Sequence, residues 1–249
     1  MDKYLLCNQV KSYERAYMSF MSIEKFPPYS LHSVRTQLDD ARSKGFGTPA
    51  SVHYNPQTNE HILTVSSDLI MPEYLIFHEF THILDVEEYA KADKWKYASL
   101  SGFMEYHASQ VELLKLTGAL NITQPKEFTM RTMVTTFANT ETVQQYVNAK
   151  YQLAHELFSR SDFPADFEAL KVGLGVLYNY WGLRSVCEIH APDFVEKRDN
   201  DIFTTHIPSD LFCDTDGLMH GWLNNTEVIK SMNNYLEIML TLAKNSGLA

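Results

Sequence analysis

The amino-acid sequence predicts an α+β protein that is predominantly helical, with a small β-hairpin or sheet beside one central helix. Long segments after residue 70 place apolar side chains at the spacing of an amphipathic helix. Two short runs, 51–54 and 61–65, flank a polar turn and predict the hairpin. The composition, 45% hydrophobic and 12% aromatic, is typical of a globular chain with an ample core.

Residues 1–50 are expected to form a helical lead-in that packs on the rest of the protein. Apolar side chains recur at helical spacing over residues 9–24. After an interruption at Pro27, Ser30 could cap a second helix that runs to about Lys44. No residue of this lead-in is expected to be catalytic.

The hairpin leads into a helix that carries an H-E-x-x-H sequence, His78-Glu79-Phe80-Thr81-His82. Residues four apart lie about 40° apart around a helix axis, so both imidazoles point the same way, and the intervening carboxylate lies within reach. Zinc binds neutral imidazoles, and a water on zinc needs a nearby carboxylate to accept its proton. The sequence therefore predicts His78 and His82 as zinc ligands and Glu79 as the catalytic base.

A second long helix is predicted over residues 97–117, with Gly118 as its stop. Catalytic zinc usually takes three protein ligands and leaves one position open, so a third ligand is needed. Glu105 and His107 are the candidates on this helix. The helix directs them about 200° apart, so only one of them can face the metal.

The remaining residues, 119–249, are expected to form a mostly helical C-terminal part. Helices are predicted within residues 131–160, as one or two, and over 165–188 and 225–244, whereas 191–224 reads as loop-rich. No repeat or clear linker marks a boundary, so we expect a single domain over 1–249. Its parts are the lead-in (1–50), a metal-binding core (51–118) and the C-terminal part (119–249).

Charge and cysteine usage exclude several classes of protein. The net charge of −10 leaves no basic surplus for phosphates, so no nucleic-acid partner is expected. The three widely spaced cysteines, Cys7, Cys187 and Cys213, indicate neither a disulfide framework nor a metal knuckle. No apolar run approaches about 18 residues and no signal-peptide segment opens the chain. We expect a cytoplasmic protein with no membrane partner; no feature indicates an oligomeric state.

Two motifs resemble those of known metalloproteins. His78-Glu79-x-x-His82 followed by a glutamate on the next helix is the gluzincin pattern, and residues 105–114 resemble the second-helix signature of the ImmA/IrrE family. That family contains intracellular metalloproteins often associated with phages or mobile elements. The resemblance implies a zincin-like fold, Glu105 as the third ligand, and Ser109 in place of the residue that orients a ligand histidine. The chain departs from the family at Thr81, where the family usually has Gly, and in the shorter side chain of Ser109.

The function expected from these features is zinc-dependent hydrolysis of peptide bonds in an intracellular protein or peptide. The alternative is a zinc-containing regulatory or host-interaction protein of phage or mobile-element origin with little or no proteolytic activity. Ser109 and Asp85 are expected to hold a ligand histidine, and the substrate is expected to lie beside the strand 61–65. Four residues are candidates for the donor that stabilises the oxyanion or supplies a proton: Tyr106, His107, Tyr151 and His155.

Overall fold

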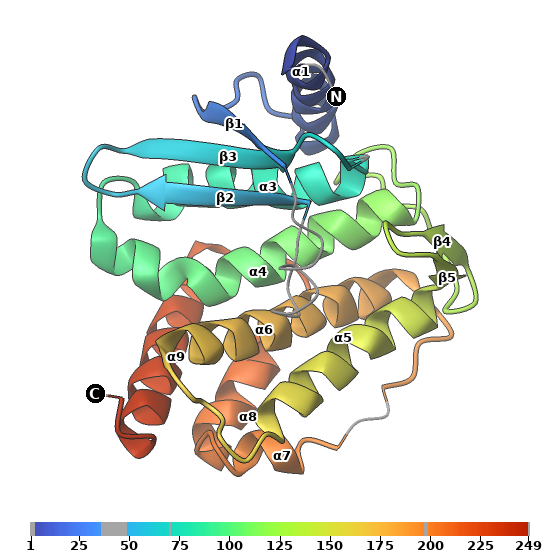
Figure 1. Cartoon of the computed structure of the whole chain (residues 1–249). Helices are drawn as coiled ribbons and strands as arrows, with labels where there is room; N and C mark the ends of the chain where they lie inside the picture. Colours follow the sequence, from blue (N-terminus) through green and yellow to red (C-terminus); the bar gives the residue numbers. More distant parts are fainter. Residues whose placement is uncertain (1–2, 36–48, 70, 197–198, 249) are drawn as a thin grey trace.

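The computed structural model of the chain describes residues 3–35, 49–69, 71–196 and 199–248. Figure 1 shows the N-terminal helix and a small sheet at one end of the molecule, followed by successive layers of helices. The helix α3 (Glu73–Asp85) packs on the strand β2 (Ala50–Asn55) and on α4 (Lys94–Leu116). The helix α4 packs in turn on α6 (Phe167–His190), which also contacts α5 (Val143–Phe158). The α+β class with a predominance of helix is therefore confirmed, as is the position of the sheet beside the H-E-x-x-H helix.

The three-stranded sheet has the strand order β1-β3-β2, with β1 spanning Ser30–Val34, β2 Ala50–Asn55 and β3 Glu60–Ser66. The predicted hairpin is confirmed as β2 and β3, which pair antiparallel. The strand β3 is central because β1 pairs with it in parallel on its other side. The helix expected from Ser30 is wrong over residues 30–34, where pairing with β3 decides for a strand; residues 36–44 of that expectation lie outside the described residues.

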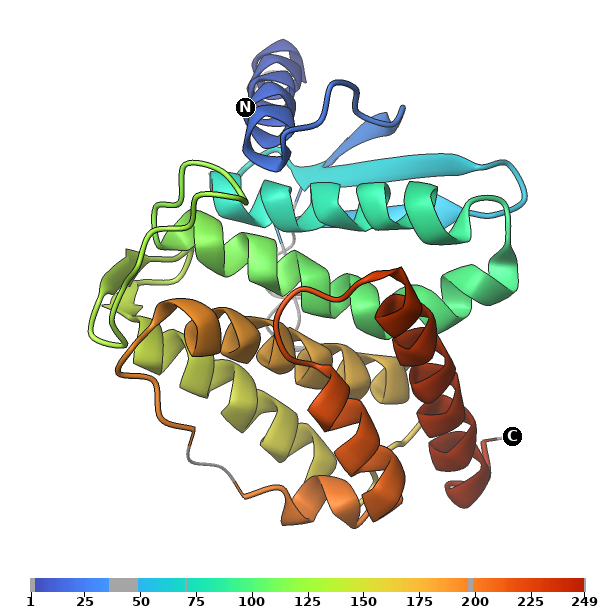
Figure 2. The same cartoon turned by 180° about the vertical axis from the view of Figure 1, so that it is seen from behind.

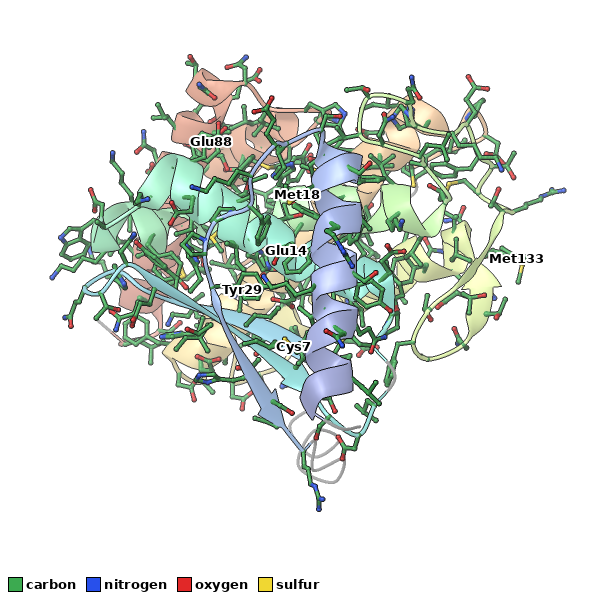
Figure 3. All side chains as sticks on the ribbon, turned by 90° about the horizontal axis from the view of Figure 1, so that it is seen from above. Cys7, Glu14, Met18, Tyr29, Glu88 and Met133 are labelled. Carbon is green, nitrogen blue, oxygen red and sulfur yellow. The ribbon has the colours of Figure 1, made fainter. Side chains whose placement is uncertain are left out.

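The first helix, α1 (Lys3–Met21), lies against α3, as Figure 3 shows from above. Tyr17 on α1 contacts Phe77 edge-on, with 5.2 Å between the ring centroids. The hydroxyl of Tyr17 also lies 3.0 Å from that of Thr81, and both residues are fully buried. The aromatic contacts confirm that the lead-in helix packs on the core, and they anchor the face of α3 opposite its histidines.

The two motif helices are joined by a short connection that begins with a π-helical turn. The helix α3 spans Glu73–Asp85 and continues as one π-helical segment, η1 (Val86–Ala90). The next helix, α4, spans Lys94–Leu116; the side chain of Asp93 caps its N-terminus by accepting hydrogen bonds from two backbone N–H groups. Gly118 follows with φ +84°, so the predicted glycine stop is confirmed.

The C-terminal part contains more regular structure than its sequence predicts. A hairpin of β4 and β5 precedes α5, so the start of the 131–160 helix prediction is wrong, and two helices, α7 and α8, occupy the segment expected to be loop-rich. In the view from behind, α9 lies beside α4 (Figure 2). The elements are β4 (Met133–Thr135), β5 (Thr140–Thr142), α5 (Val143–Phe158), α6 (Phe167–His190), α7 (Asp201–Thr204), α8 (Ser209–Leu218) and α9 (Asn225–Asn245).

Two further expectations can be compared with the described part of the chain. The cysteines are all unpaired, with Cys187 buried and the other two exposed. Among the described helices, none has the length and apolar character needed to cross a membrane.

Candidate metal centre

Three side chains from two neighbouring helices converge at the interface of α3 and α4. His78 and His82 lie one turn apart on α3, and Glu105 faces them from α4. One Glu105 oxygen is 3.5 Å from His78 Nε2, and the other is 3.7 Å from His82 Nε2. Ligand atoms around a tetrahedral zinc lie roughly 3.4 Å apart, given bonds of about 2.1 Å. The group could therefore hold a metal ion, with all three donor atoms within 4.8 Å of one another.

His107, the rival third ligand, lies away from this group. Its Nδ1 is 2.8 Å from Asp85 Oδ1, and its ring stacks on Phe103. The separation of about 200° around α4 turns Glu105 toward the two histidines, whereas His107 meets α3 at Asp85, the last residue of that helix. Of the two candidates, only Glu105 joins the histidines.

Burial and charge set the protonation of the three donors. Burial lowers the pKa of His82 to about 4, so its imidazole is neutral near pH 7. Burial acts in the same direction on His78, but the carboxylates of Glu105 and Glu112 outweigh it and raise the pKa of His78 to about 10. Burial would raise the pKa of Glu105, but the two histidines and Asn179 hold it at about 2. Glu105 is therefore a carboxylate in every ordinary buffer.

His78 is oriented by a carboxylate that had no predicted role. Its Nδ1 lies 2.7 Å from Glu112 Oε2, and the hydroxyl of Tyr146 donates a hydrogen bond to the other oxygen of Glu112. Glu112 is buried and lies two turns after Glu105 on α4, so the helical repeat placed it on the same face. That spacing was a usable signal in the sequence, whereas nothing local indicates Tyr146, which comes from α5.

Ser109 and Asp85 do not contact the ligand histidines. The hydroxyl of Ser109 donates a hydrogen bond to Asn179 on α6, and the Asn179 side chain bonds to Glu105. The prediction that Ser109 orients a histidine is therefore corrected: Ser109 positions Asn179, which bonds to the glutamate. Asp85, about one turn after His82 on α3, bonds to His107 instead.

Glu79 lies at the wall of a cavity beside the three donors. Its carboxylate accepts a hydrogen bond from the backbone N–H of Val52 on β2. Burial raises the pKa of Glu79 to about 7, although His78 and this N–H pull the pKa down. A carboxyl group whose pKa lies near 7 can both accept and return a proton at neutral pH.

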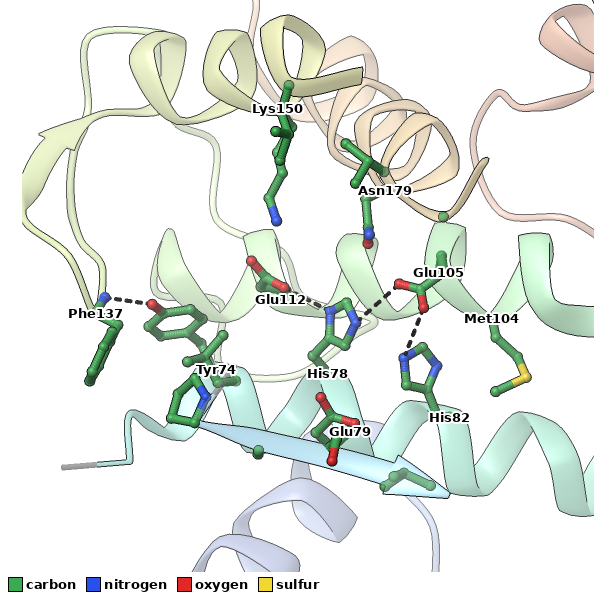
Figure 4. A pocket seen from close by; sticks show the side chains of 18 of the residues that line it. Tyr74, His78, Glu79, His82, Met104, Glu105, Glu112, Phe137, Lys150 and Asn179 are labelled. Carbon is green, nitrogen blue, oxygen red and sulfur yellow. Dashed lines mark hydrogen bonds and ion pairs between the residues drawn. The ribbon is translucent and has the colours of Figure 1, made fainter. Parts of the chain in front are cut away.

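The cavity has a volume of about 680 Å³ and opens between the sheet side and the helical side of the molecule. Figure 4 shows Glu79, His78 and His82 on one wall and Lys150 and Asn179 on the other. The hairpin of β4 and β5 borders one end, where Phe137 N–H donates a hydrogen bond to the Tyr74 hydroxyl at 2.6 Å. The polar side chains that line it include Tyr74, His78, Glu79, His82, Tyr97, Glu105, Glu112, Glu141, Tyr146, Lys150, Lys171 and Asn179.

The four candidate donors lie outside this cavity. Tyr106 donates a hydrogen bond to the Gly221 carbonyl at 2.6 Å. His107 contacts Asp85, Tyr151 contacts Asp199, and His155 contacts Ser159. The expectation that one of them faces the reacting bond is therefore corrected. The residues concerned are Tyr106, His107, Tyr151 and His155; the hydroxyl and ammonium groups that do line the cavity come from other positions.

The expected substrate strand is also corrected. The strand β3, which contains residues 61–65, pairs on both sides and has no open edge for a peptide. The two edge strands are β1 and β2, and it is β2 that borders the cavity, which residues 49–52 line. Because Val52 N–H bonds to Glu79, this edge of β2 faces the metal-binding group.

Comparisons with models of protein families, with curated proteins and with solved structures find no match to this chain. The resemblance to gluzincins and to the ImmA/IrrE signature therefore rests on the motif residues themselves. What the described residues establish is a His–His–Glu group at a cavity, with the geometry to hold a metal ion.

Proposed function

We propose that the protein is a zinc metallopeptidase of the gluzincin type that hydrolyses peptide bonds in a protein or peptide substrate. The observation that carries the proposal is the convergence of His78, His82 and Glu105 beside Glu79 at the wall of an open cavity. Two imidazoles and one carboxylate are a usual ligand set of catalytic zinc. A structural zinc is commonly enclosed by four protein ligands and needs neither a base nor a cavity.

Each residue has a defined task in this proposal. His78, His82 and Glu105 would hold the ion, which supplies Lewis acidity to a carbonyl group and to water when bound. The Glu79 carboxylate takes the proton of the attacking water and passes it to the departing amine. The Val52 N–H keeps that carboxylate turned toward the cavity. Glu112, bonded to His78 Nδ1, fixes the ring so that Nε2 faces the metal position.

The edge of β2 is the proposed backbone-binding surface for an extended substrate. An edge strand offers N–H and C=O groups that can bind a peptide main chain, while pockets select its side chains. Residues 49–52 line the same cavity as Glu79 and the three donors. A peptide beside β2 would therefore pass between the sheet and the wall formed by α5 and α6.

The decisive test compares Glu79→Gln with the unchanged protein after zinc loading. The amide is nearly isosteric but cannot accept a proton, so we expect bound zinc to persist and peptide hydrolysis to fall by about 10²–10⁴-fold. Zinc content is measured by elemental analysis, and cleavage by mass spectrometry of a peptide library. Glu88→Gln, at an exposed position on η1, is the matched control and should retain both properties.

Two results would contradict the proposal. Undiminished cleavage by Glu79→Gln would show that this carboxylate is not the base. Zinc-loaded protein that cleaves no member of the library or of a cell extract would favour the alternative function, a regulatory protein that carries the metal without proteolysis.

A further inference from the structure

Lys150 brings a positive charge into the cavity from the wall opposite the metal-binding group. It lies on α5, its side chain is half-buried, and its ammonium points into the cavity in Figure 4. Among the described residues, none forms a hydrogen bond or ion pair with it. The ammonium group of Lys150 therefore has no partner of its own in the described part of the chain, and it faces the space that a substrate would occupy.

The four carboxylates that line the cavity are already bonded to other groups; that of Glu141 accepts a hydrogen bond from the Thr136 hydroxyl. Glu112 uses one oxygen for His78 and the other for Tyr146. Glu105 is bonded to His78 and Asn179, and Glu79 to the Val52 backbone. Lys150 is thus not the counter-ion of an existing cluster.

The surroundings of Lys150 favour binding of an anion. Four apolar side chains line the same wall on α5 and α6: Ala149, Leu153, Val172 and Val176. Charge–charge interaction is stronger next to apolar surface than in bulk water, because the effective dielectric constant is lower. The chain as a whole carries a net charge of −10, so a local cation is needed for an acidic ligand to approach this cavity.

We propose that Lys150 binds a carboxylate of the peptide substrate and so determines which peptides are cleaved. This inference rests on the proposed peptidase function and specifies its substrate class. The carboxylate is either the C-terminus of the peptide or the side chain of an acidic residue. A terminal carboxylate would restrict the enzyme to short C-terminal fragments, whereas a side-chain carboxylate would select acidic sites within a chain.

The test uses peptidic hydroxamates, which bind zinc directly and need no turnover. One series ends in a free carboxylate one, two or three residues from the hydroxamate, and a second carries Glu or Asp at those positions with an amidated end. Each compound has a neutral amide counterpart. Affinities for the zinc-loaded protein are measured by calorimetry, and we expect one carboxylate compound to bind at least about tenfold more tightly than its counterpart.

Variants assign that difference to Lys150. Lys150→Met should remove the carboxylate preference and leave the affinity for neutral compounds unchanged, whereas Lys150→Arg should retain most of it. Lys244→Met, which removes an exposed lysine on α9 away from the cavity, is the matched control and should keep the preference. Circular dichroism checks the fold of each variant, and Lys150→Gln replaces Lys150→Met if the latter is unfolded.

The outcomes separate this inference from the peptidase proposal. Equal binding of carboxylate and amide compounds, or a preference that survives Lys150→Met, would overturn the Lys150 subsite even if peptides are hydrolysed. A preference that depends on Lys150, in a protein that hydrolyses no peptide, would uphold the subsite and contradict the peptidase function.

Discussion

The two histidines of the H-E-x-x-H sequence are supported differently. His78 faces Glu105 through Nε2 and bonds to the buried Glu112 through Nδ1 at 2.7 Å. Nδ1 of His82 is buried and has no hydrogen-bond partner among the described residues. A carboxylate behind an imidazole fixes the ring and makes its other nitrogen a better ligand. His78 is therefore the ligand whose geometry depends most on a neighbouring side chain.

We predict that Glu112→Gln weakens zinc binding by about 10–100-fold, the usual effect of removing a charged group behind a ligand histidine. The change keeps the side-chain volume but removes the negative charge next to Nδ1. Zinc affinity is measured by competition with a chromophoric chelator. Glu156→Gln, at an exposed position on α5, serves as the control. Equal affinities for both variants would show that Glu112 does not support His78.

At the scale of elements, α4 is the helix that holds the site together. It packs on α3, which carries the histidines, and on α6, which carries Asn179. The approach of α6 to α4 is close at Gly182, where an added Cβ would lie 2.1 Å from the Tyr106 carbonyl oxygen. Further along the same α4–α6 interface, Gly175 lies against the side chain of Glu105. Small residues on α6 thus set the distance from which Asn179 reaches Glu105.

We predict that Gly182→Ala lowers the free energy of unfolding by about 1–3 kcal/mol, since the methyl group must push the two helices apart. Urea denaturation followed by circular dichroism measures the change. Gly217→Ala on α8 is the matched control: apart from adjacent residues and the backbone of its own helix, no described atom lies within 4 Å of the added Cβ, and the helix gains up to about 1 kcal/mol from the replacement. A Gly182→Ala protein as stable as this control would contradict the tight α4–α6 contact.

At the scale of the whole molecule, a bound metal would connect two parts of the fold. Its histidine ligands belong to α3, which packs on the sheet and on α1, and its glutamate belongs to α4, which packs on the C-terminal helices. An ion that binds only the folded chain stabilises it in proportion to the logarithm of its concentration. Stability should therefore report on the ligand set.

We predict that zinc at 100 times its dissociation constant adds about 2.7 kcal/mol to the free energy of unfolding and raises the melting temperature. Glu105→Ala should abolish the response to zinc, because it removes a ligand from α4. His107→Ala should respond normally, since His107 bonds to Asp85 and lies outside the group. Scanning calorimetry with added zinc and with chelator makes the measurement. A zinc response lost only in His107→Ala would reverse the ligand assignment.

The sequence by itself determined what depends on neighbours within a few residues. The four-residue spacing puts His78 and His82 on one face of α3 because a helical turn repeats every 3.6 residues. The hairpin of β2 and β3 follows from two β-forming runs around a polar turn. The stop of α4 at Gly118 follows from the φ of +84° that glycine adopts without strain.

Only the tertiary structure decided what depends on segments far apart in the chain. Residues 30–34 became a strand because β3 offered a partner for pairing, and no local pattern encodes that partner. The choice of Glu105 over His107 required the rotation of α4 against α3, which packing sets. Asn179 and Lys150 reached the cavity from α6 and α5, more than 60 residues after the motif, because helices that pack side by side bring distant positions together.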